Sequence, residues 1–331
     1  MKSKLIRAFG DLGGYQLARL ATARKPRILM YHRFNPIEKK HEVSAAVFEQ
    51  QLKTIKRYFN PMTVAQLANL QRNNNRPPKY AIAITVDDGY RDFYEVAYPL
   101  LRHYGVPATF YVTTGFINGD IWLWPDQVTW LLNNKTKAAT TTVLANKQFD
   151  LSANSSELWW PIVGHFLSVA NSERVEGLKQ LEISCSVELP KKAPDIYSSV
   201  GWSELEEMQK NGIEIGGHTV THPSLGHMLP QDAAREITQS MVTLTEKLGK
   251  QERSFCYPNG TPDDYSDTVK KLVDDAGYVA AVTCFSDKFN LDIPFAWRRF
   301  VGSEQTFQFN KSLFGVAQLG NNIRSTVRCG Y

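Results

Sequence analysis

The sequence predicts a parallel α/β barrel that carries an insertion. Short apolar strands alternate with amphipathic helices over most of the chain, which is the pattern of consecutive βα units. With 331 residues, 43% of them hydrophobic and 21% charged, the chain is long enough for one large folded domain. The alternation stops between residues 117 and 200, where we expect an insertion on one face of the barrel.

Each predicted strand is a short apolar run, and each predicted helix repeats its apolar residues every three to four positions. Ser44 begins the first such helix, and Gly105 ends the one that starts at Arg91. We expect strands at 27–32, 80–89, 107–115, 213–218, 253–258, 278–284 and 297–302. We expect helices at 44–59, 62–70, 91–104, 202–212, 232–248 and 264–276, with one at 173–181 inside the insertion.

Residues 1–26 form a basic, amphipathic N-terminal segment ahead of the main domain at 27–331. The segment predicts either a helix that caps the barrel or a helix that lies on a membrane surface. It lacks the continuous apolar core of a secretory signal, and no run of about 18 apolar residues predicts a membrane-spanning helix. We therefore expect a protein of the cytoplasm or of the inner face of the membrane.

Charge and cysteine content narrow the function classes. The net charge of +5 is modest and does not require a nucleic-acid partner. The four cysteines show no close pairs, which argues against a cysteine-type zinc site. Without a secretory signal, they favour a reducing compartment over disulfide bonds.

Chemically capable side chains follow the ends of the predicted strands. In a parallel barrel all carboxyl ends of the strands meet at one rim, where active sites form. Residues that are far apart in the sequence are therefore expected to converge there: His32, Asp87, Asp88, His218, Pro258, Asn259, Arg298 and Arg299.

Asp87 and Asp88 precede Gly89 at the end of one strand. An Asp-Gly pair is common in plain turns, so Asp88 alone is explained equally well by a turn. His218 and His222 follow two glycines, and Pro223 favours a loop for the second histidine. Spaced by four residues, both imidazoles can face one ion.

Two imidazoles and one carboxylate leave positions open for water and substrate. We expect Asp88, His218 and His222 to bind one divalent metal ion, with zinc preferred over cobalt, nickel and iron. Such an ion acidifies water and polarises a carbonyl group, and both effects assist amide hydrolysis. Asp87, beside the ion but free of it, is then the natural general base.

These motifs resemble those of the polysaccharide deacetylase family, also called the NodB-homology or carbohydrate esterase 4 family. TVDDG is similar to its first motif, GGHTVTHPSL to its second and FCYPNG to its third. The resemblance runs from about residue 28 to residue 302 and implies a distorted (β/α)7 barrel. It implies Asp87 as the base and Asp88, His218 and His222 as metal ligands. The Asn259 N–H would contribute to an oxyanion hole formed by the third motif, with Tyr257 and Pro258.

The third motif departs from the family pattern, because Cys256 stands in place of its arginine and Asn259 in place of its tyrosine. The late histidine that serves the family as general acid is also missing, since no histidine follows His227. One branch, which acts on poly-N-acetylglucosamine, has an early acid histidine, and ILMYHRF resembles its opening strand. The resemblance therefore assigns the general acid to His32. The alternative is that His32 has a structural role.

An arginine of the last strand is expected to replace the third-motif arginine, whose position Cys256 occupies. Arg298 or Arg299 would pair with Asp87 and orient it, with Arg299 favoured, unless both are surface charges. Tyr90 follows the first motif and is expected to line the substrate cleft. Trp122, Trp124 and Trp202 either stack on sugar rings or pack in the core.

The resemblance implies hydrolysis of the N-acetyl group of an N-acetylhexosamine unit, in a polysaccharide, a lipid-linked glycan or a small glycoside. Two other functions stay open. A two-histidine, one-carboxylate site also occurs in iron oxygenases. The altered third motif also allows a metal-containing protein that binds glycans without catalysis.

Overall fold

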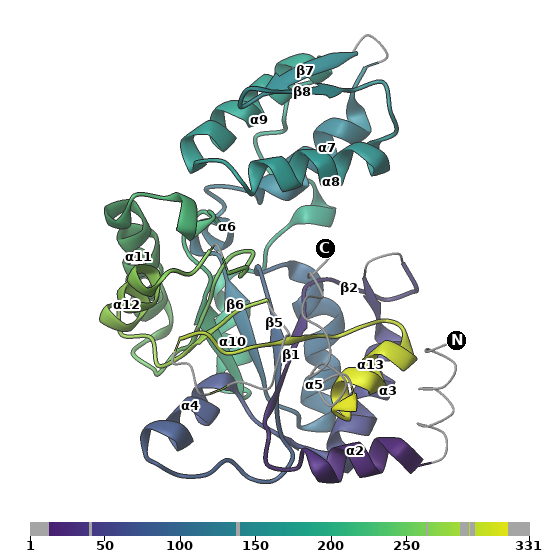
Figure 1. Cartoon of the computed structure of the whole chain (residues 1–331), viewed down its shortest axis with the longest axis vertical. Coiled ribbons are helices and arrows are strands. Elements are labelled where there is room, and N and C mark those ends of the chain that lie inside the picture. The colour runs from purple at the N-terminus through teal and green to yellow at the C-terminus, as the bar shows by residue number, and fades with distance from the viewer. Residues whose placement is uncertain are drawn as a thin grey trace.

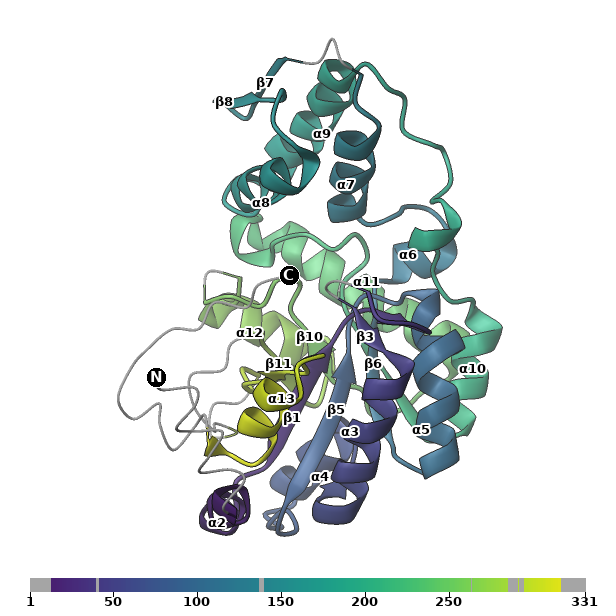
Figure 2. The same cartoon turned by 90° about the vertical axis from the view of Figure 1, so that its right-hand side faces the viewer.

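The computed structural model describes residues 13–39, 42–136, 140–262, 264–284, 291 and 295–316. A barrel of strands and helices forms one body, and the insertion forms a lobe above it (Figure 1). The view from the side shows the same two parts (Figure 2). None of the helices in the described part of the chain is long and apolar enough to cross a membrane.

The central sheet is parallel and closes on itself. Its strands follow the order β11-β10-β9-β6-β5-β1-β12, and short β4 (Asn60–Pro61) pairs with the start of β5. Trp297 bridges to Val282 of β11, and Phe300 pairs with Leu29 of β1, so the last strand segment joins both edges. The predicted distorted (β/α)7 barrel is confirmed. The strands are β1 (Arg27–Tyr31), β5 (Ala81–Val86), β6 (Ala108–Val112), β9 (Ile213–Gly217), β10 (Phe255–Cys256), β11 (Ala281–Val282) and β12 (Phe300–Val301).

Helices cover the outside of this sheet, as expected for a barrel whose strands are buried on both faces. They are α2 (Tyr15–Ala21), α3 (Ala45–Tyr58), α4 (Val64–Arg72), η2 (Phe93–Ala97), α5 (Tyr98–Tyr104), α6 (Thr114–Asn118), α10 (Trp202–Lys210), α11 (Pro230–Leu248), α12 (Asp267–Asp275) and α13 (Thr306–Leu313). The predicted N-cap is confirmed at α3, where the Ser44 side chain accepts a hydrogen bond from the Val47 backbone N–H.

The helix predicted at 91–104 differs in its first part. Residues Phe93–Ala97 form a π-helical segment, η2, and regular α-helix begins only at Tyr98. Pro99 lacks a backbone N–H and sits in the first turn of α5, where that donor is not needed. Gly105 ends α5 in the left-handed conformation with φ of +60°, as the sequence predicts.

The insertion folds around its own hydrophobic core. It contains α7 (Trp124–Asn134), the antiparallel pair β7 (Thr141–Leu144) and β8 (Lys147–Asp150), α8 (Ser155–Phe166) and α9 (Asn171–Cys185). The helix predicted at 173–181 lies within α9. Leu131, Ile162, Phe166 and Leu181 are among the side chains that fill this core.

The N-terminal segment is described only from residue 13. Tyr15, the first residue of α2, packs against Phe314 with ring centres 5.3 Å apart. Leu17 and Leu20 of the same helix are exposed. Residues 1–12, which carry most of the predicted amphipathic pattern, lie outside the described residues. Three of the four cysteines are described, and Cys185, Cys256 and Cys284 are buried.

A buried carboxylate ties four elements together at the start of the strands. Glu214 of β9 accepts hydrogen bonds from the Ala65 N–H (2.8 Å) and the Thr109 hydroxyl (2.8 Å) with one oxygen. Its other oxygen accepts from the N–H (2.9 Å) and the hydroxyl (2.6 Å) of Ser254. It thereby links α4, β6 and the chain entering β10.

Replacement of Glu214 by alanine is expected to lower the free energy of unfolding by about 3 kcal/mol, because two buried N–H groups and two hydroxyls lose their acceptor. Chemical denaturation followed by circular dichroism measures the change. Glu206→Ala on α10 removes an exposed ion pair with Lys210 and is the control, with a loss of less than about 0.5 kcal/mol. Equal losses for the two variants would show that Glu214 does not stabilise the barrel.

Candidate active site

Strand β5 delivers two neighbouring carboxylates to the rim of the barrel. Neighbouring residues of a strand point to opposite faces, so Asp87 and Asp88 would diverge if the strand continued. Instead β5 ends at Val86, and Asp88 has a φ of +82°, which L-residues rarely adopt. The Thr113 N–H donates to the Asp88 carbonyl at 3.1 Å. Each carboxylate then has an oxygen within 4.8 Å of a ring nitrogen of His218.

Asp88, His218 and His222 form a compact buried group. Asp88 Oδ1 lies 3.4 Å from His218 Nε2 and 3.3 Å from His222 Nε2. Two ligand atoms about 2.1 Å from a tetrahedrally coordinated ion lie about 3.4 Å apart, so this spacing suits such a site. His218 Nδ1 lies 2.7 Å from the Cys256 carbonyl oxygen, a contact that fixes the ring orientation.

The polar atoms of this group support a bound cation. Asp88 Oδ1 and both ring nitrogens of His222 are among the buried side-chain atoms that have no hydrogen-bond partner within the described residues. Buried polar atoms nearly always have partners, so these atoms indicate a ligand between the two residues. Two imidazoles and one carboxylate are a donor set suited to zinc and related divalent ions. The residues therefore fit a divalent metal ion.

A second cluster of ligand-type side chains, formed by Asp87, His218 and Cys256, lies beside the first. Its electrostatics argue against a cation. The Arg299 guanidinium contacts both Asp87 oxygens and the Cys256 sulfur, the latter at 3.1 Å. A fixed positive charge already occupies this side of Asp87, so of the two groups found in the described residues the Asp88 group suits a metal ion better.

The loop between the two histidines is held by helix α11. Glu236 accepts hydrogen bonds from the N–H groups of Val220 (2.8 Å) and Thr221 (2.9 Å) and from the Thr221 hydroxyl (2.7 Å). His222 has a φ of +57°, and the segment is not helical, as Pro223 predicts. Three hydrogen bonds to one carboxylate therefore stabilise a strained loop that carries two predicted ligands.

The insertion also holds this loop. The indole N–H of Trp124, on α7, donates to the His222 carbonyl at 3.2 Å. The Arg174 guanidinium, on α9, donates to the same oxygen at 3.4 Å and lies over the Trp124 ring. Burial lowers the pKa of Arg174 to about 10. Neither contact could be read from the sequence, because no local spacing relates these residues to His222.

Asp87 forms a bidentate pair with Arg299. Its two oxygens each accept a hydrogen bond at 2.7 Å from one terminal nitrogen of the guanidinium. Arg299 is fixed in turn by the Thr283 carbonyl (2.8 Å) and the Thr85 hydroxyl (3.0 Å). Burial of Asp87 is the largest single effect and favours its neutral form, but the charge and hydrogen bonds of Arg299, together with His32 and His218, keep the pKa of Asp87 below its ordinary value. Asp87 is therefore ionised and rigidly oriented.

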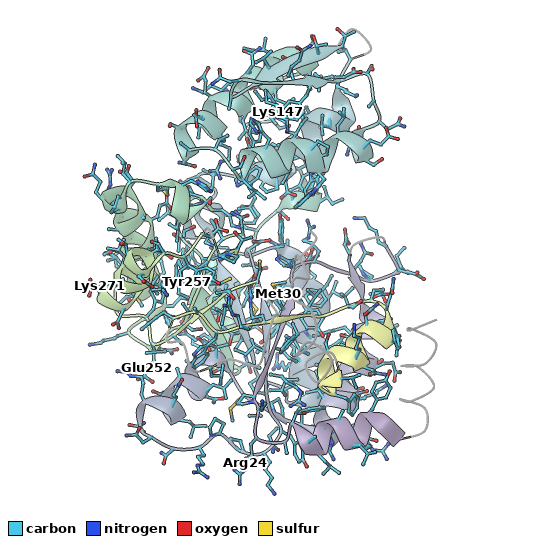
Figure 3. All side chains as sticks on the ribbon, viewed as in Figure 1. Arg24, Met30, Lys147, Glu252, Tyr257 and Lys271 are labelled. Carbon is cyan, nitrogen blue, oxygen red and sulfur yellow. The ribbon has the colours of Figure 1, made fainter. Side chains whose placement is uncertain are left out.

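His32 follows β1 and lies beside Asp87. Its Nε2 lies 3.6 Å from Asp87 Oδ2, and 26% of its side chain is exposed. Both residues line a narrow pocket of about 60 Å³, together with Met30, Trp160, Leu167, His218, Tyr257, Asn259, Thr261, Cys284 and Arg299. Met30 and Tyr257 lie near the centre of the molecule in Figure 3, between the insertion at Lys147 and the far end at Arg24.

The third motif turns at the same pocket. Asn259 is buried with a φ of +62°, and its backbone N–H donates no hydrogen bond within the described part of the chain. Its side-chain nitrogen is likewise buried without a partner there. The Gly260 N–H donates to the Pro258 carbonyl at 2.8 Å, and the Tyr257 hydroxyl donates to the Phe295 carbonyl at 2.8 Å. The turn thus leaves an unused donor beside the pocket.

The remaining predicted residues lie outside this pocket. Tyr90 is buried, its hydroxyl donates to Asp126 at 2.6 Å, and the Arg33 guanidinium lies 3.9 Å from its ring centre. Trp122 is buried as well, and the Trp202 indole donates to Asn118. Glu236, Arg174 and Trp160, which no sequence motif includes, contact the ligand loop or the pocket instead.

Comparison with known proteins matches the family model for polysaccharide deacetylase at residues 74–157 and 160–281. One relative is a Bacillus subtilis (strain 168) protein with the provisional name polysaccharide deacetylase YxkH. It is 21% identical over 257 residues, which are 77% of this chain and 63% of the relative. Another is the Staphylococcus aureus (strain N315) poly-beta-1,6-N-acetyl-D-glucosamine N-deacetylase. It is 32% identical over 82 residues, 25% of this chain and 28% of the enzyme. The chain thus spans less than two thirds of the length of these relatives.

Two solved structures share the fold. The Streptococcus pyogenes deacetylase PplD, solved in complex with acetate, aligns with a TM-score of 0.58 and 20% identity over 86% of this chain and 96% of its own. IcaB from Ammonifex degensii aligns with a TM-score of 0.57 and 16% identity over 88% of this chain and 97% of its own. Because the family model covers more than half of its residues, this chain belongs to the polysaccharide deacetylase family.

Proposed function

We propose that this protein is a metal-dependent N-deacetylase that removes acetyl groups from N-acetylhexosamine units of a glycan. One observation carries the proposal: a buried group of two imidazoles and a carboxylate lies beside a separate, arginine-bound carboxylate. The matched family and the name of the Staphylococcus aureus relative support the reaction and the sugar class. The glycan is a polysaccharide, a lipid-linked saccharide or a small glycoside.

Asp88, His218 and His222 would hold the metal ion, and we propose zinc. A divalent ion there supplies Lewis acidity, which polarises the acetyl carbonyl and makes a nearby water more acidic. Asp87 then accepts the proton of the attacking water. The pairing with Arg299 suits this role, because it keeps Asp87 ionised and aims it at the pocket.

The Asn259 backbone N–H donates to the oxygen that becomes negative as the water attacks. This N–H donates no hydrogen bond within the described structure, so it remains available to the oxyanion. His32 protonates the departing amine. Its Nε2 lies 3.6 Å from Asp87 Oδ2, and 26% of its side chain is exposed to solvent, from which it can regain its proton.

Neither of the two alternative functions explains the Asp87–Arg299 pair. An iron oxygenase has no need of a buried Asp87–Arg299 pair beside its metal ligands. A glycan-binding protein without catalysis has no need of a second carboxylate that the guanidinium keeps ionised. Acetate release from oligomers of N-acetylglucosamine separates all three functions, because only a deacetylase produces it.

Replacement of Asp87 by asparagine is expected to reduce the rate of acetate release by about 100-fold or more, because the amide cannot accept a proton. The metal content should stay at one ion per chain, since Asp87 is not a ligand. His222→Ala is the matched variant and should lose the ion. Acetate assays and elemental analysis on the same samples measure both quantities, and an active Asp87→Asn enzyme would contradict the role of Asp87 as base.

Replacement of His32 by alanine is expected to slow acetate release by about 100-fold with the metal retained, because the amine then departs without a proton donor. An acetyl ester with a good leaving group, such as p-nitrophenyl acetate, needs no such donor. Its hydrolysis should therefore change less than about threefold. Equal losses on the amide and the ester would assign His32 a structural role.

Replacement of Trp124 by phenylalanine is expected to weaken zinc binding by about tenfold, because the His222 carbonyl loses one donor while the ring volume is largely kept. Competition with a zinc-binding dye measures the affinity. Trp202→Phe removes an indole hydrogen bond to Asn118, outside the ligand loop, and is the control. Unchanged affinity in Trp124→Phe would mean that α7 does not position the ligand.

A further inference from the structure

Helix α8 of the insertion brings one large aromatic side chain to the mouth of the candidate active site. We propose that Trp160 is the platform on which the pyranose ring of the substrate stacks. It would thereby make the site favour acetyl groups carried by a sugar over acetyl groups without one. The inference rests on the proposed function, because it assigns the sugar-binding residue of that site. It concerns a segment that none of the recognised motifs includes.

Trp160 packs its ring only loosely within the insertion, against the neighbouring Trp159 with ring centres 6.1 Å apart. The neighbouring Trp159 packs against the insertion core, and its indole N–H donates to the Thr129 hydroxyl at 2.8 Å. Trp160 is not part of that core and is 45% exposed, the only one of the seven tryptophans among the exposed large apolar side chains. Tryptophan is enriched at binding surfaces because its ring offers a large apolar face.

Trp160 lines the pocket of the candidate active site. Together with Leu167 it contributes the insertion's share of the pocket that contains His32, Asp87 and Asn259. Figure 1 and Figure 2 both show α8 on the side of the insertion that faces the barrel. An acetamido group that reaches Asp87 therefore carries its sugar ring past Trp160.

The size of the pocket indicates where that ring must lie. Its volume is about 60 Å³. A cavity that holds one benzene molecule measures roughly 150 Å³, so this pocket admits an acetyl group but not a six-membered sugar ring. The pyranose stays at the mouth, where Trp160 offers a flat apolar surface to its C–H face while the hydroxyl groups remain in water.

The other tryptophans near the site cannot do this. Trp122 and Trp124 are buried, and Trp124 is engaged with the His222 carbonyl. Trp202 binds Asn118 and does not line the pocket. Trp160 is therefore the one tryptophan that combines exposure with a place at the pocket.

The test compares the zinc-loaded wild-type protein with Trp160→Ala, Trp160→Phe and a control, Ile183→Ala. Ile183 is also an exposed apolar residue of the insertion, at 69%, but it does not line the pocket. For N-acetylglucosamine oligomers we expect Trp160→Ala to raise KM about tenfold with kcat within twofold of wild type, because stacking is lost and the catalytic groups are intact. Trp160→Phe should restore KM to within about threefold, and Ile183→Ala should match wild type.

Hydrolysis of p-nitrophenyl acetate, which has no sugar ring, and the zinc content should be unchanged in all variants. An unchanged KM in Trp160→Ala, or equal losses on the oligomer and the ester, would overturn the platform. If the wild-type protein releases no acetate, the proposed function fails instead. Calorimetric binding of the same oligomer then tests the platform separately, and equal affinity for wild type and Trp160→Ala would overturn it.

Discussion

The guanidinium of Arg299 makes it possible for two adjacent carboxylates to have different tasks. Asp87 and Asp88 follow each other in the chain and face the same rim, so two negative charges must be balanced within a few ångströms. Arg299 neutralises Asp87 with two short hydrogen bonds, and Asp88 is left to the two imidazoles. Because the Arg299 guanidinium already supplies a positive charge beside Asp87, a metal ion would bind more favourably at Asp88.

The insertion contacts the proposed active site directly. It has its own core, yet Trp124 and Arg174 reach out of it to the carbonyl of His222, and Trp160 reaches the pocket. Glu236 holds the same loop from the barrel side. The ligand loop is thus held between two bodies, so the placement of the insertion and the geometry of His222 depend on each other.

Much of the fold and of the site follows from local sequence patterns. The alternation of strands and helices predicted the closed parallel barrel, and the runs around Asp88 and His218 bring neighbouring residues together at strand ends, which depends only on local geometry. The choice between Arg298 and Arg299 depends on which face of the last strand turns inward, a matter of register with β1 and β11. Trp160 could not be separated from six other tryptophans, because the packing of the insertion decides which ring stays exposed.

Anomalous X-ray diffraction from crystals of the zinc-loaded protein tests the central claim most directly, because it locates the ion independently of activity. The account predicts one strong peak about 2.1 Å from Asp88, His218 Nε2 and His222 Nε2, with the Asp87–Arg299 pair intact beside it. A peak bound by Asp87 and Cys256, or no peak at the rim in fully loaded protein, would contradict it.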